Sequence, residues 1–421
     1  MKIIADLHIH SRFSQATSND LSIDTLEKYA RIKGVNLLGT GDFTHPKWIQ
    51  ELKEKLTEEE GILRTKNKFP FVLQTEISLI YSQDGKGRRI HNIVLAPSFE
   101  VVEQITEYLL KHGRVDYDGR PIFKIPCPEF VESLMSISKD IEVIPAHIWT
   151  PWFSIFGSNS GFNSVEECFK DKAKFIHALE TGLSSDPGMN YRLSILDKYN
   201  LVSFSDLHSY WPWRIGREAT IFDIDMNYKE LIIALRTSNG LSGTIEFWPE
   251  EGKYHYDGHR ACNVCLKPSD SIKNKNICPV CGRPLTIGVA NRVEELADRP
   301  EGFIPKTAKP YKNLIPLSEL IAGVAKQKVH SKKVWEDYNN LIKNFDNEYR
   351  ILLEVPEEEL RIATSEKIAD VIIKNRNMKI KINPGYDGVY GVPVFDETEE
   401  KKDEQVITTL KHRQTGLDDF S

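Results

Sequence analysis

The chain has 421 residues, of which 40% are apolar and 28% charged, and its net charge is −6. This length predicts two or three domains, and this composition excludes a wholly disordered or collagen-like protein. No apolar run reaches the roughly 20 residues that a bilayer span needs, and the first residues lack the apolar stretch of a signal peptide. We therefore expect a cytoplasmic protein without membrane contact, in which any contact with phosphates depends on local charge.

Short apolar runs alternate with amphipathic stretches from residue 2 to about residue 248. Eight runs are predicted as strands: KIIADL, VNLLGT, FVLQTEISLI, HNIVLA, IEVIPAH, KFIHALE, LVSFSD and ATIF. Helices are predicted between them, among others at residues 23–33, 99–111 and 189–198. This alternation predicts an α/β fold with a largely parallel sheet or barrel. A barrel is favoured because reactive residues follow most of the strands, and barrels collect such residues at one mouth.

The pattern changes after the barrel of residues 1–248. Residues 249–315 are rich in turns and contain two pairs of cysteines. Residues 316–395 are expected to form a small, mainly helical domain, which a strand, a turn and a second strand close. Its predicted helices span residues 317–325, 334–345, 356–361 and 365–374. Residues 396–421 are charged and poor in apolar side chains, which predicts a disordered tail.

His8 and His10 alternate with Asp6 at the end of the first predicted strand, so the three side chains point to the same side. An H-x-H pair alone is weak support for a metal site, because strand histidines are often ordinary polar core residues. The same residue types recur along the later strands, however, with Glu76 within the third predicted strand and His91 at the start of the next. Together the candidate metal ligands are His8, His10, Asp42, His45, Glu76, His91, His147, Asp206 and His208.

These imidazoles and carboxylates are too many for one ion, which takes about four to six ligands. Two or three divalent ions, bridged by a shared carboxylate of Glu76 or Asp206, are the simplest interpretation. Clustered ions lower the pKa of a bound water and neutralise charge on a leaving oxygen, which is the chemistry of phosphate-ester hydrolysis. The sequence therefore predicts a metal-dependent phosphoesterase. The alternative is a single structural metal among packing histidines.

Two further residues are candidates for the catalytic reaction. Glu180 ends a predicted strand and is a ligand, a base or, as we favour, a partner that holds a histidine ring in one tautomer. Arg12 directly follows the first motif, where its planar guanidinium is placed to pair with two phosphate oxygens. A surface ion pair is an equal alternative for Arg12.

Four of the six cysteines form two C-x-x-C pairs, Cys262 with Cys265 and Cys278 with Cys281. This arrangement is typical of a zinc ribbon or a similar finger, and four thiolates leave no open coordination position, so one structural zinc is predicted. A redox role is the weaker alternative. Lys and Arg outnumber Asp and Glu around the finger, which fits either a nucleic-acid backbone or a solvated surface.

Aromatic residues follow two of the candidate ligands, His147 and His208, and are expected at the mouth of the barrel. Such side chains stack on unpaired bases, or they pack beneath a long loop. The candidates for DNA contact are Trp149, Trp152, Phe153, Trp211, Trp213 and the adjacent Arg214.

The motifs DLHIHS and SDLH, with an isolated glutamate and two isolated histidines between them, resemble the PHP (polymerase and histidinol phosphatase) superfamily. The resemblance implies a distorted β/α barrel with a trinuclear zinc or manganese site in about half of the chain. This sequence departs from the superfamily pattern in two places. The second motif is spread as D-F-T-H, which leaves open whether Asp42 or His45 is the ligand. After the first motif, only Gln15, Thr17 or Asp20 is available for a further ligand.

The barrel, the cysteine pairs and the stretches EELADRPEGFIPKTAKPYKNLIPLSELIAGV and PGYDGVYG together resemble the endonuclease Q family of archaeal and some bacterial DNA-repair proteins. This resemblance covers nearly the whole chain. It implies a nucleoid-associated enzyme that uses Zn²⁺, Mg²⁺ or Mn²⁺, recognises uracil, hypoxanthine, xanthine or abasic sites in DNA, and nicks the strand on the 5′ side of the lesion. The alternatives are a PHP-type small-molecule phosphoesterase and a DNA-binding scaffold without activity.

The last residues, QTGLDDFS, resemble the peptide by which proteins bind the sliding clamp PCNA. One helical turn would place Leu417 and Phe420 on the same face as an apolar plug, with Gln414 as a polar anchor. The family pattern has two adjacent aromatic residues, whereas Ser421 follows Phe420 here. A frayed charged tail is the alternative.

Overall fold

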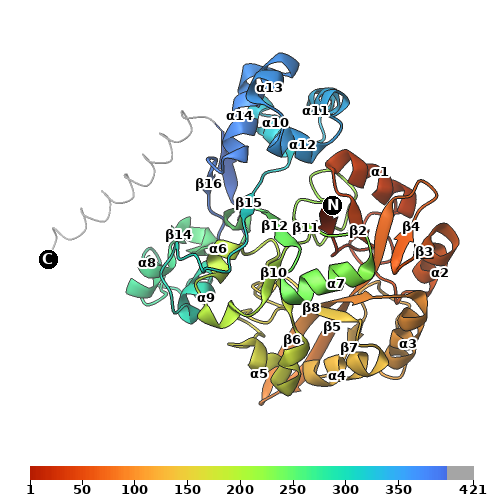
Figure 1. The fold of residues 1–421 in the computed structure, drawn as a ribbon. Coiled ribbons are helices and arrows are strands. Elements are labelled where there is room, and N and C mark those ends of the chain that lie inside the picture. The colour runs from red at the N-terminus through yellow and green to blue at the C-terminus, as the bar shows by residue number, and fades with distance from the viewer. Residues whose placement is uncertain (396–421) are drawn as a thin grey trace.

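The structure is a computed structural model that describes residues 1–395 (Figure 1). The predicted disordered tail and clamp-binding peptide, at residues 396–421, lie outside the described residues. Within the described part, no helix combines the length and the apolar character that crossing a membrane requires.

A distorted β/α barrel occupies the first part of the chain, and all eight runs predicted as strands form strands there. Its strands are β1 (Lys2–Asp6), β2 (Leu37–Gly39), β5 (Pro70–Gln83), β6 (Lys86–Ala96), β8 (Glu142–Pro145), β9 (Ala178–Glu180), β10 (Asn200–Val202), β11 (Ala219–Asp223) and β12 (Leu241–Glu246). Four strands lie outside these predictions, namely β12 and the short strands β3 (Thr57–Glu59), β4 (Ile62–Arg64) and β7 (Ile122–Phe123).

The main sheet is mixed, which corrects the predicted largely parallel arrangement. β1, β2 and β5 are parallel neighbours, but β5 pairs with β6 in antiparallel register from Leu73 to Gln83. Asp84 and Gly85 join these two strands, and both have positive φ angles, of 53° and 73°. An Asp-Gly turn of this kind matches the twist of an antiparallel hairpin. It leaves no room for the crossover helix that a parallel pair would need.

Two short strands complete the wall of the barrel. β9 and β10 pair with each other in parallel. Ile148 N donates to Glu180 O (3.0 Å) where β9 adjoins the end of β8, and a bridge between Ile9 and Leu207 joins the chain after β10 to the chain after β1. These two seams lack the regular ladders of the main sheet, which accounts for the distortion of the barrel.

Helices cover the outside of the barrel. They are α1 (Ile23–Lys33), α2 (Pro46–Lys55), α3 (Phe99–Leu110), α4 (Cys127–Ile137), α5 (Val165–Phe169), α6 (Pro187–Asn190) and α7 (Tyr228–Thr237). α1 has the predicted bounds because the Ser22 side chain accepts from Thr25 N at its start and Gly34, with φ of 95°, ends it.

The helix predicted at residues 189–198 is wrong. α6 ends at Asn190, and only a short 3₁₀ turn, Ser194–Leu196, follows. Hydrogen bonds to a distant segment replace the helical ones: Asp298 N donates to Arg192 O (3.1 Å), and Ser194 N donates to the Asp298 carboxylate (2.8 Å). Tertiary contacts thus override the helical pattern of the sequence.

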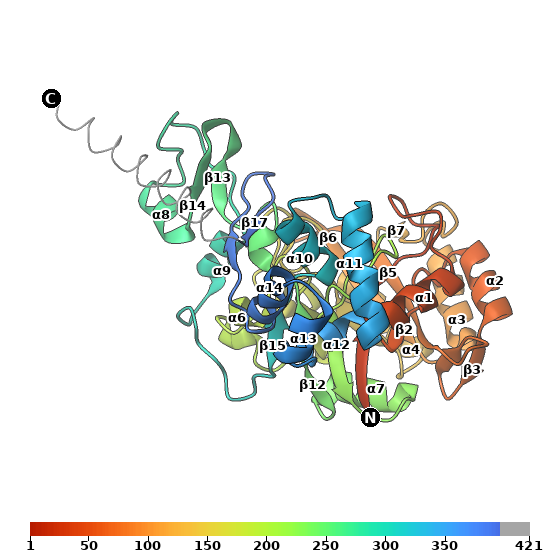
Figure 2. The ribbon, with the colours of Figure 1, turned by 90° about the horizontal axis from the view of Figure 1, so that it is seen from above.

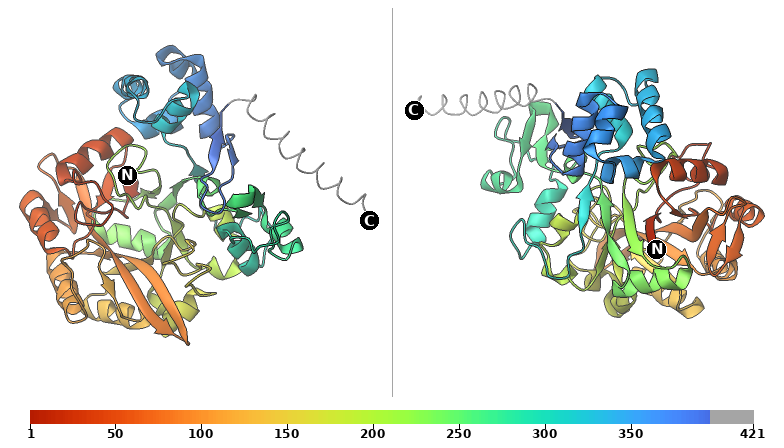
Figure 3. Two further views of the ribbon diagram at one scale, coloured as in Figure 1. Left: turned by 180° about the vertical axis from the view of Figure 1, so that it is seen from behind. Right: turned by 45° about the horizontal axis from the view of Figure 1, so that its top comes forward.

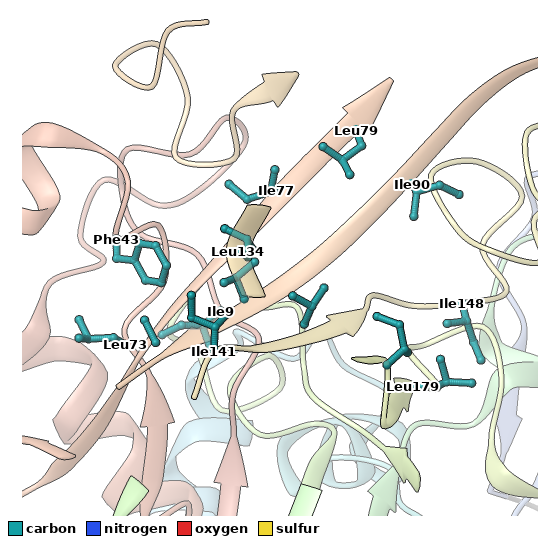
Figure 4. Close-up of a cluster of buried hydrophobic side chains, with 14 of the residues drawn as sticks. Ile9, Phe43, Leu73, Ile77, Leu79, Ile90, Leu134, Ile141, Ile148 and Leu179 are labelled. Atoms are coloured by element: carbon teal, nitrogen blue, oxygen red, sulfur yellow. The ribbon is translucent and has the colours of Figure 1, made fainter. Parts of the chain in front are cut away.

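The core of the barrel follows from strand alternation. Ile3, Ala5 and Leu7 on one side of β1 share a buried cluster with residues of α7, while Asp6, His8 and His10 occupy the other side. A second cluster lies between the β5–β6 hairpin and α4, where Ile77 and Leu134 are packed (Figure 4). The metal-ligand candidates are therefore carried on strands whose opposite faces are fixed by apolar packing.

The cysteine segment forms a separate small unit. It contains β13 (Asp257–His259), β14 (Val264–Leu266), α8 (Pro268–Lys273) and α9 (Val289–Leu296), and it lies at the opposite end of the molecule from α2 and α3 (Figure 2). The chain then returns to the barrel, where β15 (Tyr311–Asn313) pairs in parallel with β12. The barrel sheet thus includes a strand from beyond residue 248.

The C-terminal part is a cluster of helices with its own apolar core, as predicted. Its helices are α10 (Leu317–Ala325), α11 (Lys332–Phe345), α12 (Glu348–Leu353), α13 (Glu357–Ala363) and α14 (Glu366–Arg376). The hairpin of β16 (Lys381–Asn383) and β17 (Val392–Val394) follows. The cluster sits on the barrel beside α1 (Figures 1 and 3), where Lys33 Nζ lies 2.6 Å from Glu348 Oε1.

Candidate metal centre

His8 and His10 lie side by side at the end of β1, with ring centroids 5.6 Å apart. The Nδ1 atom of His8 donates to Glu180 (2.9 Å), and that of His10 donates to Asp42 (3.0 Å). A carboxylate on Nδ1 fixes the ring and presents Nε2 as the free ligand atom, as in the carboxylate–histidine pairs of metal sites. Both histidines therefore aim Nε2 at the same space.

Glu76 and Asp206 complete a first group of candidate ligands with these two histidines. One ligand atom from each of the four residues lies within 4.8 Å of the others. His10 Nε2 is 3.2 Å from Glu76 and 3.1 Å from Asp206. His8 Nε2 is buried and has no hydrogen-bond partner, 3.5 Å from Glu76 Oε2. A buried nitrogen that faces two carboxylates in this way fits a bound cation.

Glu76 also belongs to a second group, with His91 and His147. Its Oε1 atom is 2.7 Å from His91 Nδ1 and 3.2 Å from His147 Nε2, while its Oε2 atom faces the first group. The two oxygens of one buried carboxylate therefore serve two neighbouring groups. This is the geometry of a bridging ligand, and these residues fit two divalent ions.

The charges of the centre depend on one another. Burial opposes a charge on His8, yet the carboxylates of Glu180, Asp206 and Glu76 raise its pKa well above the usual range. Burial also opposes a charge on Glu76, but His91, Arg120 and His8 hold its pKa well below the usual range. For His91, burial dominates and lowers the pKa to about 4. The Glu76 carboxylate is therefore ionised, as metal binding requires.

Three residues of the site have a left-handed backbone, namely Asp42, His147 and Asp206, with φ angles of 43°, 31° and 47°. Each follows the end of a strand. This conformation is uncommon for residues other than glycine and costs about 1–3 kcal/mol. Such strain persists only where the surroundings enforce it, and it gathers at functional sites.

The structure does not bring every predicted ligand into the two groups. Asp42 holds the His10 ring, and it also accepts from Ser11 N (2.6 Å). His45 stacks on Phe13, with centroids 4.5 Å apart, and its Nδ1 atom is buried without a hydrogen-bond partner. His208 borders the first group, 4.6 Å from His10 between ring centroids.

Asp6 faces the same side as His8 and His10 but belongs to neither group. Its carboxylate accepts hydrogen bonds from Ser205 N (2.9 Å), Ser205 Oγ (2.6 Å) and Gly216 N (2.9 Å). Burial raises its pKa to about 6 despite these bonds. Asp6 therefore ties β1 to the loop that carries Asp206 and His208.

Of the two residues predicted to take part in the reaction, Glu180 lies in the centre and Arg12 pairs with a carboxylate of α2. Glu180 receives hydrogen bonds from the His8 ring and, through Oε2, from His147 N (2.6 Å), which is the favoured role of holding a histidine. Arg12 forms an ion pair with Glu51. The cation that does reach the centre is Arg120, whose NH1 atom lies 3.1 Å from Glu76 Oε2. Arg120 follows no strand-end motif, so the sequence offered no signal for it.

A cavity of about 370 Å³ opens beside the second group. His91, His147 and Asp206 line it together with Arg120 and Trp152. The side chain of Arg120 is 27% exposed, although its partner Glu76 is fully buried. The cavity therefore gives a ligand access both to the candidate metal ligands and to a cation.

The aromatic candidates fall into three environments. Phe153, like Trp152, lines the cavity. Trp149 is buried and donates from Nε1 to Asn190 (2.8 Å), so its prediction as a DNA contact is corrected: it has no surface on which a base could stack. Trp211 and Trp213 stack with centroids 5.2 Å apart and pack on Trp335 of α11. The adjacent Arg214 is exposed.

The cysteine unit holds a further candidate metal site, and it departs from the predicted set at one position. His259, Cys262, Cys278 and Cys281 offer ligand atoms within 4.8 Å of one another, and His259 Nδ1 is 3.4 Å from Cys281 Sγ. Cys265 is absent because His259 pairs with Val264 across the β13–β14 ladder, so the next residue, Cys265, points to the opposite face. His259 lies three residues before Cys262 in the sequence. It was not predicted as a ligand, because the two C-x-x-C pairs already supplied four thiolates.

Histidines and carboxylates cluster on the strands of the barrel and in the loops that follow them, in two groups that share one glutamate. This arrangement defines a PHP-type protein with candidate sites for divalent metals. Comparison with solved structures identifies the family. The lesion-specific endonuclease PfuEndoQ from Pyrococcus furiosus superposes with a TM-score of 0.85 and 30% identity, over 94% of this chain and 96% of that one. The chain belongs to the endonuclease Q family.

Three further similarities were found. An endonuclease Q in complex with a 27-mer duplex substrate, which has an abasic lesion at the active site, superposes with a TM-score of 0.83 and 31% identity over 94% of this chain and 98% of that one. A family model described as the MJ0043 C-terminal domain matches residues 316–379. Protein MJ0043 of Methanocaldococcus jannaschii is 32% identical over 291 residues, which are 67% of this chain but only 35% of MJ0043.

Proposed function

We propose that this protein is a metal-dependent DNA endonuclease that cuts one strand beside a deaminated base or an abasic site. The observation that carries the proposal is the position of Glu76, whose two oxygens face two separate groups of candidate ligands. A pair of divalent ions in such groups lowers the pKa of an attacking water and neutralises the leaving oxygen of a phosphodiester. Membership of the endonuclease Q family supports DNA as the substrate.

The residues of the chain have separate roles in this proposal. His8, His10, Glu76 and Asp206 would hold one ion, and Glu76, His91 and His147 would hold the other. Glu180 keeps the Nδ1 proton of His8 and so directs Nε2 toward the first group. Arg120 lines the cavity beside Glu76, where its guanidinium neutralises charge on the phosphate that is cut.

The proposed substrate is a lesion rather than ordinary duplex DNA. Deaminated bases pair weakly and abasic sites do not pair, so turning the damaged nucleotide out of the helix costs less there than at a normal base pair. A cavity that adjoins the candidate metal ligands is suited to receive such an extruded nucleotide. We place the cut on the 5′ side of the lesion, which yields a 3′-hydroxyl and a 5′-phosphate.

The test is cleavage of end-labelled duplexes that contain one deoxyuridine, one deoxyinosine, one abasic site or no lesion. Mg²⁺, Mn²⁺ and Zn²⁺ are supplied separately. We expect a nick 5′ to the lesion, absent from the undamaged duplex and abolished by His8→Ala. His112→Ala is the matched control, because His112 is an exposed histidine outside the cavity, and it should cut like the wild type.

Intact duplexes under all three metals would overturn the proposal. Hydrolysis of a small phosphomonoester under the same conditions, lost in His8→Ala, would then assign the centre to a small-molecule phosphoesterase. Cleavage that persists in His8→Ala would place the reaction away from the candidate metal centre.

A further inference from the structure

We infer that the outward face of the β5–β6 hairpin and β7 forms a track that holds a DNA strand next to the metal centre. This inference rests on the proposed function, because it assigns the surface over which that substrate runs. The hairpin extends beyond the body of the barrel (Figures 1 and 3). Two cations there have no assigned role so far, Arg89 of β6 and Lys124 directly after β7, and Trp152, from the loop after β8, lies beside them.

Strand register shows that the cations share a face with the metal ligands. Neighbouring positions across the β5–β6 ladder are Glu76 with Ile93, Ser78 with His91, and Ile80 with Arg89. Because alternate residues of a strand point to the same side, the face that presents Glu76 and His91 continues outward to Arg89. The step from His91 to Arg89 is two residues, or about 7 Å along the strand.

β7 extends this face on the other side of β5. Ile122 pairs with Ser78, so it lies on the same side as Glu76, and Lys124 follows Ile122 by two residues. Phe123, between them, is buried, whereas Ile122 and Lys124 are both exposed. Lys124 and Arg89 therefore flank the outer part of β5 on one face.

Arg89 is free to bind an anion. Its guanidinium lies over the ring of Trp152, 5.1 Å from the centroid, and over Phe153 at 5.6 Å. Within residues 1–395, neither Arg89 nor Lys124 has a carboxylate partner. The preceding residue, Arg88, contrasts with it: Arg88 is buried, donates to Gly161 O and stacks on Phe162. Arg88 therefore supports the fold, and Arg89 faces solvent.

A groove joins these residues to the cavity of the metal centre. Arg89, Lys124 and Trp152 line a groove of about 610 Å³, and Trp152 also lines the cavity that contains His91 and His147. Among the described residues that line the groove, none has a carboxylate. Trp152 is 48% exposed, so one of its faces is available to a base while Arg89 lies over its ring.

Phosphates and bases of a DNA strand fit this combination. Unpaired cations beside an exposed aromatic ring form the usual surface for a strand whose bases are partly unstacked, because the cations pair with phosphates and the ring stacks on a base. A strand that enters the cavity at its damaged nucleotide has displaced bases on either side of that point. We assign the two cations to phosphates next to the one that is cut, and Trp152 to a base beside the lesion.

The test compares the binding of a labelled duplex with an abasic site, by fluorescence anisotropy, with divalent ions withheld so that the DNA is not cut. The variant is Arg89→Ala/Lys124→Ala. Two lost phosphate contacts should weaken binding by roughly 10-fold and should lower the slope of log affinity against log salt by about 1.4 to 1.8. Lys66→Ala/Lys229→Ala removes the same charge from exposed, unpaired residues elsewhere and should retain the wild-type slope.

Stacking on Trp152 is measured with 2-aminopurine placed beside the lesion. Wild-type protein should quench its fluorescence, Trp152→Ala should not, and Trp152→Tyr should restore quenching. A wild-type slope in Arg89→Ala/Lys124→Ala, with wild-type protein that cuts the lesion duplex, would overturn the track and leave the proposed function intact. Wild-type protein that neither binds nor cuts any lesion duplex would overturn the proposed function itself.

Discussion

Glu180 shows how a residue outside both ligand groups controls them. Its carboxylate holds the His8 ring and the His147 backbone at once. We expect Glu180→Gln to weaken Mn²⁺ binding by about 10- to 100-fold, because a ligand histidine that loses its orienting carboxylate also loses basicity. Isothermal titration measures this. The control is Glu142→Gln, which removes a carboxylate that accepts from His177 at 2.9 Å, away from the centre; equal affinities in the two variants would contradict the assigned role.

Glu246 makes the stability of the fold depend on pH. Burial raises its pKa to about 8, and its Oε2 atom accepts from Thr181 (2.8 Å) and Ser203 (2.9 Å). The folded state therefore keeps a proton that the unfolded state releases near the ordinary pKa of about 4.5. The contribution of this proton to the free energy of unfolding, up to roughly 5 kcal/mol, is fully present below pH 4.5. It is lost as the pH rises from 4.5 to about 8.

Glu246→Gln removes this titration while it keeps a polar group for both hydroxyls. Denaturant unfolding at pH 5, 7 and 9 should show a smaller loss of unfolding free energy in the variant than in the wild type. The difference between the two profiles reports Glu246 together with the neighbouring buried Glu218, whose pKa Glu246 helps to raise. Parallel profiles would show that Glu246 is ionised in the folded protein.

At the scale of elements, the β13–β14 hairpin determines which side chains of the cysteine unit can share an ion. Since Cys265 points away from the His259 face, we expect Cys265→Ser to keep the zinc content of the wild type and His259→Ala to lose about one equivalent. Metal analysis of the purified variants by mass spectrometry measures both. The reverse result would restore the four-cysteine set predicted from the sequence.

The sequence predicts elements well where local pattern and packing agree. α1 has its capping serine and its terminal glycine in the sequence, and the strands carry continuous apolar runs. The helix at residues 189–198 failed because Asp298, more than 100 positions later in the chain, takes its backbone bonds. Most candidate ligands of the centre were predicted because they follow strands, although Glu76 and His91 lie within β5 and β6. Arg120 could not be predicted, because it reaches Glu76 from a loop without any motif.

Across the whole molecule, one buried ion pair joins the barrel to the C-terminal helices. Lys33 of α1 and Glu348 of α12 are both buried, and Glu348 also accepts from Tyr338 Oη (2.9 Å). Lys33→Met should lower the unfolding free energy by about 3–5 kcal/mol, because it leaves a buried carboxylate without its counter-charge. Denaturant unfolding measures the loss.

Two further variants sharpen this test. Lys33→Met/Glu348→Gln removes both charges and should recover part of the lost stability. Lys2→Met breaks an exposed pair with Glu354, 3.1 Å apart, and should cost at most about 1 kcal/mol. If Lys33→Met costs no more than Lys2→Met, the pair does not fasten the two parts together.

The pairing of β15 with β12 bears on how the protein can be dissected. β12 would be an open edge of the sheet if the chain stopped at residue 248, and uncovered edges recruit other chains into aggregates. Residues 311–313 cover that edge after the excursion through the cysteine unit. The segment between β12 and β15, which contains the cysteine unit, is therefore attached to the barrel sheet at both of its ends. It is an insertion into the barrel domain rather than a separate appended domain. We therefore expect a fragment that ends at residue 248 to expose the edge of β12 and to self-associate.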